Sequence, residues 1–263
     1  MLRLYHCDFS TCSQKVRLCL AEKELAFESQ VVDLAAREHL KPDYLALNPN
    51  GVVPTLLFAG QPVVDSSVIC EFLEEMFPAP ALSPADALGR ARMRAWMRYL
   101  EEAPTAAIRV PSFNRIFAGA FADLDDEAFF ALTEPMPLRK GFYREMGRGG
   151  FTAAKVEESL ERLRQTLRRA ETALAKDPWL AGEAFSLADI LLIPTAVRMQ
   201  DLGLDALWRD LPGFAGWFAR AQARASFDQA FYPGSRLDPS FSWAASGRPQ
   251  AAASHQPQHK QEQ

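Results

Sequence analysis

Strand-like patterns are confined to the first quarter of this chain, and beyond Pro84 only helical patterns remain. Short segments rich in β-branched or alternating apolar residues predict strands at residues 2–6, 27–34 and 55–65, the last as two strands around a Gly60-Gln61 turn. Apolar residues at helical spacing predict helices at residues 12–24, 37–47 and 65–77. The predicted order is βαβ, a connecting helix, and then ββα, within one domain of residues 1–80.

That order resembles the thioredoxin fold. Residues 87–243 predict an all-α domain, with long amphipathic helices at 88–100 and 152–175. Between these helices, residues 119–150 are polar and contain Pro and Gly, which favours an insertion or lid over a core element. Residues 244–263 have almost no large apolar side chains, so we expect a disordered tail. The predicted fold class is α+β: an N-terminal thioredoxin-like βαβαββα domain followed by a helical bundle.

Composition excludes several classes of function. A length of 263 residues with 48% hydrophobic content can form two modest cores, and a net charge of −4 without a basic stripe argues against nucleic acid. No apolar run approaches the ~20 residues that span a bilayer, so we expect no membrane association. Spacing gives no plausible zinc site, and hence no metal, among Cys7, Cys12, Cys19, Cys70, His6 and His39. Reduced thiols predict a cytoplasmic protein.

Three loop-to-strand or loop-to-helix junctions carry the candidate chemistry. The first is FSTCSQKVR, where Ser10 and Ser13 form an S-x-x-S frame around Cys12 at a helix start. This frame is typical either of a dithiol site that has lost its cysteines or of a site that handles the thiol of another molecule. The second is Val53-Pro54, because Pro at the first strand position, if its peptide bond is cis, leaves the Val53 backbone able to pair with an added peptide.

The third junction is Asp65-Ser66-Ser67, where an acidic N-cap and free N–H groups at a helix start can bind a charged ligand group. In order along the chain, the segments YHCDFSTCSQKVR, LNPNGVVPTL, DSSVICEFLEE and WLAGEAFSLADI resemble the glutathione transferase superfamily, over residues 1–232. The resemblance implies that the first domain binds glutathione as co-substrate. It also implies that the helical domain completes a pocket for a hydrophobic second substrate, and that the protein is a homodimer.

The resemblance also implies roles for individual residues. Val53, next to Pro54, is expected to pair with the cysteinyl part of glutathione, and Asp65 and Ser66 to hold its γ-glutamyl end. His39 and Lys41 lie where the family often binds the glycyl carboxylate. Val52 departs from the pattern, because many members carry Gln or Lys there.

A free thiol has a pKa near 8.5, so an enzyme of this kind must lower the pKa of the glutathione thiol. A hydroxyl that donates a hydrogen bond at a helix N-terminus does so through both the bond and the helix dipole. Ser13 matches the serine of theta-like and etherase-like members, whereas Ser10 matches the first serine of zeta-like members and the reactive cysteine of omega-like ones. Cys12 matches a cysteine within the zeta pattern, and the choice among the three stays open.

Ser186 and Asp189 have the spacing of a helix capping box, followed by the apolar run ILLIP. We therefore interpret them as structural residues at the start of a central buried helix.

Aromatic side chains are candidates for the second-substrate pocket. They fall into two groups: Trp96, Tyr99 and Phe113, expected on the first long helix, and Phe231, Tyr232, Phe241 and Trp243, in a Pro- and Gly-broken segment that indicates a strap. The segment TEPMPLRKGFYREMGRGGF, with VICEFLEEMFP and FSLADI, resembles the bacterial glutathione-dependent β-etherases.

The predicted function is therefore a glutathione transferase that attacks a hydrophobic electrophile, with cleavage of aromatic β-aryl ethers as the specific reaction. The alternatives are a glutathione-dependent isomerase or thiol oxidoreductase of the zeta or omega kind, and a noncatalytic glutathione-binding protein. A dithiol exchange role is disfavoured because Ser10 and Ser13 leave no resolving pair of cysteines.

Overall fold

A mixed four-stranded sheet with strand order β2-β1-β3-β4 forms the N-terminal part of the protein. The computed structural model describes residues 1–117, 121 and 123–237. The strands are β1 (Leu2–His6), β2 (Glu28–Val31), β3 (Thr55–Phe58) and β4 (Gln61–Val64). Strand β1 is parallel to β2 and antiparallel to β3, which is antiparallel to β4. This arrangement confirms the predicted thioredoxin-like topology.

Alternation along β1 gives the sheet two apolar faces, because successive strand side chains point to opposite sides. Leu2 and Leu4 belong to the main core, together with side chains of α1 (Thr11–Glu22) and α3 (Ser66–Met76). On the other face, Tyr5 contacts a small cluster that includes Tyr44 of α2 (Pro42–Leu47). The helix predicted at 37–47 is divided into a 3₁₀ turn (Glu38–Leu40) and α2, since Pro42 favours the first turn of a new helix.

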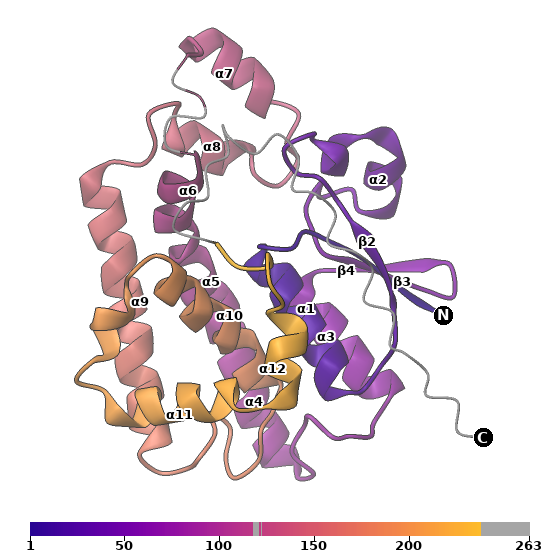
Figure 1. Ribbon diagram of the computed structural model, residues 1–263, viewed down its shortest axis with the longest axis vertical. Coiled ribbons are helices and arrows are strands. Elements are labelled where there is room, and N and C mark those ends of the chain that lie inside the picture. Colours follow the sequence, from indigo (N-terminus) through magenta and orange to yellow (C-terminus); the bar gives the residue numbers. More distant parts are fainter. Residues whose placement is uncertain (118–120, 122, 238–263) are drawn as a thin grey trace.

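The helical part is built around α10, which lies at its centre (Figure 1). Helix α10 packs against α1 and α4, and 13 of its residues are buried, as expected for a helix that is apolar on all sides. The central buried helix predicted after Ser186 is therefore confirmed. The helices of this part are α4 (Ala87–Glu102), α5 (Pro104–Ala107), α6 (Arg109–Phe117), α7 (Asp126–Thr133), α8 (Lys140–Met146), α9 (Ala153–Leu174), α10 (Leu187–Asp201), α11 (Pro212–Gln222) and α12 (Ala225–Ala230), with a 3₁₀ turn at Asp205–Trp208.

The capping box at the start of α10 also binds groups outside this helix. The Asp189 carboxylate accepts hydrogen bonds from the backbone N–H and the hydroxyl of Ser186, both at 3.0 Å. It also accepts from the Leu180 N–H at 3.0 Å and the Trp217 indole N–H at 2.8 Å. Burial raises the pKa of Asp189, and these four donors oppose that effect. Asp189 thus joins α10, α11 and the preceding loop.

The 119–150 segment contributes more to the core than its polarity predicts. Helices α7 and α8 place Phe129, Tyr143 and Met146 in a second apolar cluster, where Phe129 is completely buried. The segment also approaches the N-terminal domain, since a Cβ at Gly51 would lie 3.0 Å from a Pro137 side-chain atom. The expectation of an insertion or lid rather than a core element is thus corrected in part, because the segment builds an apolar cluster of its own, while Phe130 of α7 stays 41% exposed.

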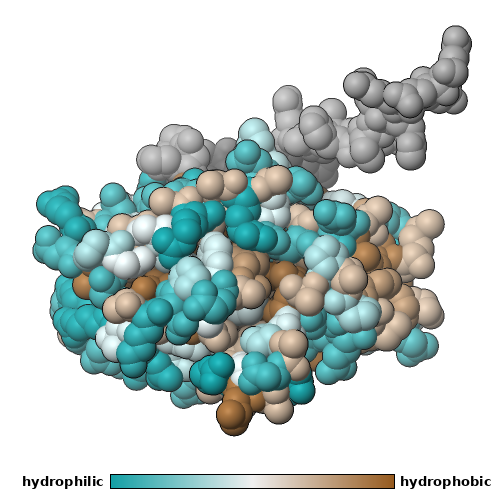
Figure 2. Space-filling model, turned by 90° about the horizontal axis from the view of Figure 1, so that it is seen from below, coloured by the Kyte–Doolittle hydropathy of each residue, from teal (hydrophilic) through white to brown (hydrophobic). Residues whose placement is uncertain are grey.

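Other predictions are not tested by the described residues. The domain boundaries at 80 and 87 stay predictions, and the tail at 244–263 lies outside the described residues, as do Phe241 and Trp243. Apolar side chains are scattered among hydrophilic ones on the face seen from below (Figure 2). In the part of the chain that the structure describes, no helix combines the length and the apolar character needed to cross a membrane.

Candidate functional site

A cleft of about 280 Å³ lies where the two domains meet. On the N-terminal side it is lined by the start of α1, the segment 34–39 and the loop before β3. On the other side it is lined by the helical segment from Thr105 to Tyr143, with Arg198 of α10 also contributing. Most of the lining area is apolar, which suits an aromatic or aliphatic ligand.

Ser10 is the N-cap of α1 and lines this cleft. Its side-chain oxygen accepts a hydrogen bond from the Ser13 N–H at 3.3 Å. Because the oxygen uses a lone pair in this contact, the hydroxyl hydrogen can be donated to an atom in the cleft. Cys12 is half-buried and lines the cleft beside Ser10.

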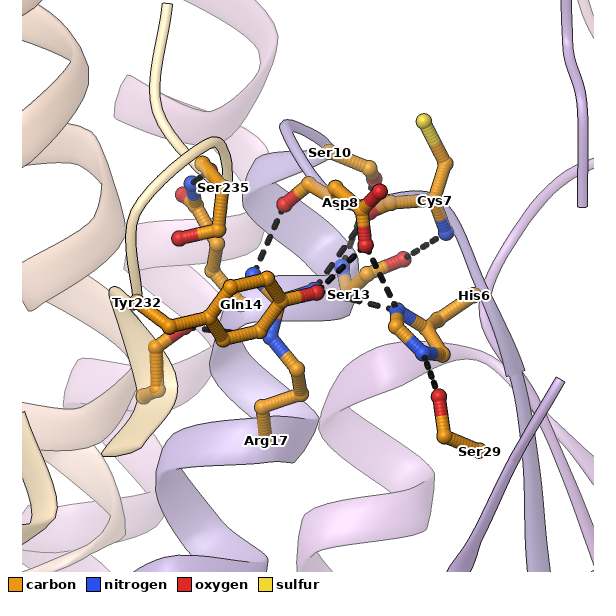
Figure 3. A network of polar contacts seen from close by, with 11 residues as sticks. His6, Cys7, Asp8, Ser10, Ser13, Gln14, Arg17, Ser29, Tyr232 and Ser235 are labelled. Carbon is orange, nitrogen blue, oxygen red and sulfur yellow. Dashed lines mark hydrogen bonds and ion pairs between the residues drawn. The ribbon is translucent and has the colours of Figure 1, made fainter. Parts of the chain in front are cut away.

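Ser13 does not line the cleft. Its side chain is completely buried, and its hydroxyl oxygen accepts a hydrogen bond from the Cys7 N–H at 3.3 Å (Figure 3). The sequence left open which of Ser13, Ser10 and Cys12 lies at the glutathione sulfur, and the structure places only Ser10 and Cys12 in the lining of the cleft. Ser13 comes one helical turn after Ser10, on the side of α1 that faces β1.

Val53 also lines the cleft, and the Val53-Pro54 peptide bond is cis. The carbonyl of the preceding Val52 accepts from the Tyr44 hydroxyl at 2.7 Å and from the Asn48 amide at 2.9 Å, which holds the loop in place. Among the described residues, no hydrogen-bond partner is found for the Val53 N–H or C=O. A peptide in the cleft can therefore pair with this residue as an added strand does.

Asp65 and Ser66 begin α3, as predicted, but they do not line the cleft. One oxygen of the exposed Asp65 carboxylate accepts from the Ser67 N–H at 2.9 Å and the Val68 N–H at 3.1 Å. Asp65 also has a positive φ of 74°. Ser66 is buried.

The two residues predicted for a carboxylate lie in different surroundings. His39 lines the cleft, and burial together with the nearby Arg37 lowers its pKa to about 4, so the ring is neutral at neutral pH. Its buried Nδ1 has no partner among the described residues. Lys41 points into solvent, with 60% of its side chain exposed, and lies 3.5 Å from Glu38. Arg37, which the sequence did not single out, also lines the cleft.

Of the predicted pocket aromatics that lie within the described residues, only Phe113 lines the cleft. It belongs to α6 and not to the first long helix, which ends at Glu102 before Pro104 begins α5. Trp96 and Tyr99 pack under the Arg169 side chain of α9 instead, at 5.0 and 4.0 Å from their ring centres. Both are therefore part of the packing between α4 and α9.

Of the residues that the structure describes, four arginines line the cleft, Arg37, Arg109, Arg139 and Arg198, and no Asp or Glu does. Sequence reasoning missed all four. Arg198 lies within a mostly apolar helix, which was a usable signal, and burial lowers its pKa to about 10. Its guanidinium donates to the Phe9 carbonyl and lies 3.8 Å from Asp201. The cleft is therefore suited to anionic ligands.

A polar network beneath Ser10 fixes the start of α1 (Figure 3). Arg17 donates to the Asp8 carbonyl at 2.7 Å and to the His6 Nδ1 at 3.2 Å, and the His6 Nε2 lies 2.8 Å from the Ser29 hydroxyl. Tyr232 donates to the Asp8 carboxylate, and its ring lies 5.1 Å from the Arg17 guanidinium. The C-terminal strap predicted around Tyr232 thus packs on the start of α1.

This strap and the last residue of α12 each have a further contact with α1. The Gln14 amide donates to the Ser235 carbonyl at 2.7 Å, and the Arg17 Nε to the Ala230 carbonyl at 3.1 Å. Phe231 is buried in the main core.

Among the described residues, no group of three or more His, Cys, Asp or Glu side chains is arranged to hold a metal ion.

Comparisons with known proteins agree with this architecture. Residues 9–76 match the family described as "Glutathione S-transferase, N-terminal domain", and residues 153–220 match "Glutathione S-transferase, C-terminal domain". Protein LigF of Sphingobium sp. is 30% identical over 248 residues, covering 90% of this chain and 95% of the relative. The crystal structure of beta-etherase LigF matches with a TM-score of 0.79, covering 88% of this chain and 98% of that one, at 30% identity.

A second relative has a different reaction in its name. The tetrachloro-p-hydroquinone reductive dehalogenase of Sphingobium chlorophenolicum is 27% identical over 240 residues, covering 86% of this chain and 94% of the relative.

Proposed function

The chain belongs to the glutathione S-transferase family, and we propose that Ser10 activates the thiol of bound glutathione for attack on an aromatic β-aryl ether. Glutathione is the co-substrate of this family. The observation that carries the proposal is the shared position of two groups: the Ser10 hydroxyl and the unpaired Val53 backbone line the same cleft. The Val53 backbone can hold the cysteinyl backbone of glutathione while the Ser10 hydroxyl donates to its sulfur.

The glycyl end of the tripeptide is assigned on the same basis, whereas the γ-glutamyl end is assigned from the resemblance alone, since Asp65 and Ser66 do not line the cleft. The Asp65 carboxylate at the start of α3, with Ser66, holds the charged γ-glutamyl end. At the other end, the neutral His39 ring and the Arg37 guanidinium are placed to contact the glycyl carboxylate. Lys41 is a weaker candidate for this contact because its side chain is exposed and paired with Glu38.

The reaction follows from a thiolate held beside an apolar cleft. Its sulfur attacks the carbon that carries the aryloxy group, next to a ketone, so that a C–S bond forms while the C–O bond breaks. The electron pair leaves on the phenoxide oxygen, which takes up a proton from solvent. Phe113 and Ile116 line the side of the cleft that would contact the aromatic ring. The similarity to LigF, whose structure is named as that of a beta-etherase, supports this substrate class.

The direct test is to incubate the protein with phenacyl phenyl ether with and without glutathione. We expect phenol and a glutathione thioether in equal amounts, and only when glutathione is present. If the protein conjugates glutathione to a chlorodinitrobenzene but releases no phenol from a panel of aryl ethers, the transferase activity stands and the proposed ether substrate is refuted. Failure to bind immobilised glutathione would refute both the transferase activity and the ether substrate.

Cys12 supports a second candidate function, because it lines the cleft beside Ser10. A cysteine in this position can exchange with a glutathione mixed disulfide, as a thiol oxidoreductase of the omega or zeta kind requires, and one relative is named as a reductive dehalogenase. Cys12→Ser separates the two functions. Full ether cleavage in this variant supports the serine mechanism, whereas loss of turnover supports the cysteine.

We also propose a cytoplasmic homodimer. Large apolar side chains remain exposed on α3 (Val68 and Met76) and on α4 (Leu88), which a partner subunit would cover. The four free cysteines are consistent with a reducing compartment. A monomer in analytical ultracentrifugation, or dimerisation unchanged by Leu88→Glu together with Met76→Glu, would contradict this interface.

A further inference from the structure

Arg109 and Arg139 line the helical side of the cleft without an acidic partner. Arg109 is the first residue of α6, and Arg139 immediately precedes α8. Both are half-buried, and neither forms a hydrogen bond or an ion pair with any residue that the structure describes. The contact recorded for Arg109 is with the face of the Phe142 ring, 5.8 Å from its centre.

Neighbouring cations of the same segment are arranged differently. Lys140 and Arg144 both pair with Glu134, and Arg148 pairs with Asp126 at 2.9 Å. These pairs are on the surface. The segment therefore supplies acids for its solvent-facing cations and none for Arg139, which faces the cleft.

Two guanidinium groups in a half-buried cleft repel each other more strongly than they would in water. Burial, with the charge of Arg109, lowers the pKa of Arg139 to about 10, so it keeps its charge at neutral pH. Among the described residues no Asp or Glu lines the cleft, and Glu101, whose charge raises the pKa of Arg139, is itself paired with Lys15 at 2.6 Å. An anionic ligand would offset the repulsion, because a guanidinium binds a carboxylate through two parallel hydrogen bonds.

We propose that Arg109 and Arg139 bind an anionic group, a carboxylate or phenolate, carried by the aromatic second substrate. This specificity rests on the proposed function, since it names the substrate of the same cleft. Phe113, on α6 one helical turn after Arg109, provides the apolar contact for the ring that carries the anion. The enzyme would therefore prefer acidic aryl ethers over their neutral analogues.

The carboxylates of glutathione are the other source of such an anion. Arg37 and His39 lie on the N-terminal side of the cleft, within the part that matches the glutathione S-transferase N-terminal domain. Arg109 and Arg139 lie on the helical side, in neither of the two matched segments, 9–76 and 153–220. Their position favours the second substrate.

The test compares phenacyl ether of para-hydroxybenzoic acid with its methyl ester, in the wild-type protein and in Arg139→Gln and Arg109→Gln. We expect each substitution to raise KM for the acid by about 10- to 100-fold, the range for loss of a hydrogen bond to a charged group. KM for the ester and the affinity for glutathione should stay unchanged. Lys140→Gln, which removes the same charge next to Arg139 but outside the cleft, should leave all three values unchanged.

Calorimetric titration with para-phenoxybenzoate and its methyl ester measures the same preference without turnover. If no ether is cleaved, the proposed reaction fails, yet the titration still decides whether the arginine pair binds anions. Equal weakening of acid and ester in Arg139→Gln would mean a structural role and overturn the proposal. Weakened glutathione binding with an unchanged preference for the acid would assign the arginines to glutathione instead.

Discussion

Replacement of Ser10 by Ala should raise the pKa of the bound glutathione thiol. The Ser10 oxygen already accepts the Ser13 N–H at 3.3 Å, which leaves its hydroxyl hydrogen to donate to the sulfur. A hydrogen bond to a charged group contributes about 1.5–3 kcal/mol, and each pKa unit corresponds to about 1.4 kcal/mol. The expected rise is therefore about one to two pKa units. At pH values below the wild-type thiol pKa, turnover should fall by about 10- to 100-fold.

The measurement is a pH titration of thiolate absorbance in the glutathione complex. Ala also removes the N-cap of α1, which by itself costs about 1 kcal/mol of stability, so Ser10→Gly is the matched control. Gly retains most of the cap stability but has no hydroxyl, and it should show the same shift in thiol pKa as Ala. Ser10→Thr, which keeps a hydroxyl, should titrate close to the wild type.

Ser13→Ala gives the opposite pattern. It removes the acceptor for the buried Cys7 N–H, so stability should fall by about 1–3 kcal/mol while the thiol pKa changes little. An unchanged thiol pKa in both Ser10 variants would refute the reasoning. So would a large pKa shift in Ser13→Ala, because its hydroxyl would then have to reach the cleft.

Two further predictions concern buried ionisable side chains. His6 has a pKa of about 3 when folded, because of burial and Arg17, and about 6.5 when unfolded. Between these values the unfolded state binds the extra proton, so stability should fall by about 1.4 kcal/mol per unit as the pH drops below 6.5. Urea titrations of wild type and His6→Gln should differ in this slope, and equal slopes would exclude the effect. Lys15 is completely buried, 2.6 Å from Glu101 and 3.0 Å from Thr105, so Glu101→Leu should cost about 3 kcal/mol. Adding Lys15→Met should recover most of that loss, and a double variant no more stable than Glu101→Leu would contradict the pairing.

Local sequence signals account for most of the fold that was predicted. The alternation in residues 2–6 and the capping box at Ser186 act through neighbours in the chain, and both are found where expected. The hairpin turn predicted at Gly60-Gln61 lies one residue earlier, at Ala59-Gly60, where both residues have positive φ and Gln61 already begins β4. The predicted pocket aromatics fared less well. Trp96 and Tyr99 have the spacing of a helix face, but spacing does not tell which partner that face meets, and here it is α9.

The sequence alone determined which local features make up the candidate site: a hydroxyl-bearing helix start, a proline-fixed loop and an acidic helix cap. It could not choose between Ser10 and Ser13, since both lie at the same helix start and the packing of α1 against β1 buries one of them. Nor could it bring together Arg109 and Arg139, which lie at the starts of two separate helices and both line the cleft. Local chemistry is specified by adjacent residues, whereas the direction in which a side chain points and the charges that surround it depend on how distant segments pack.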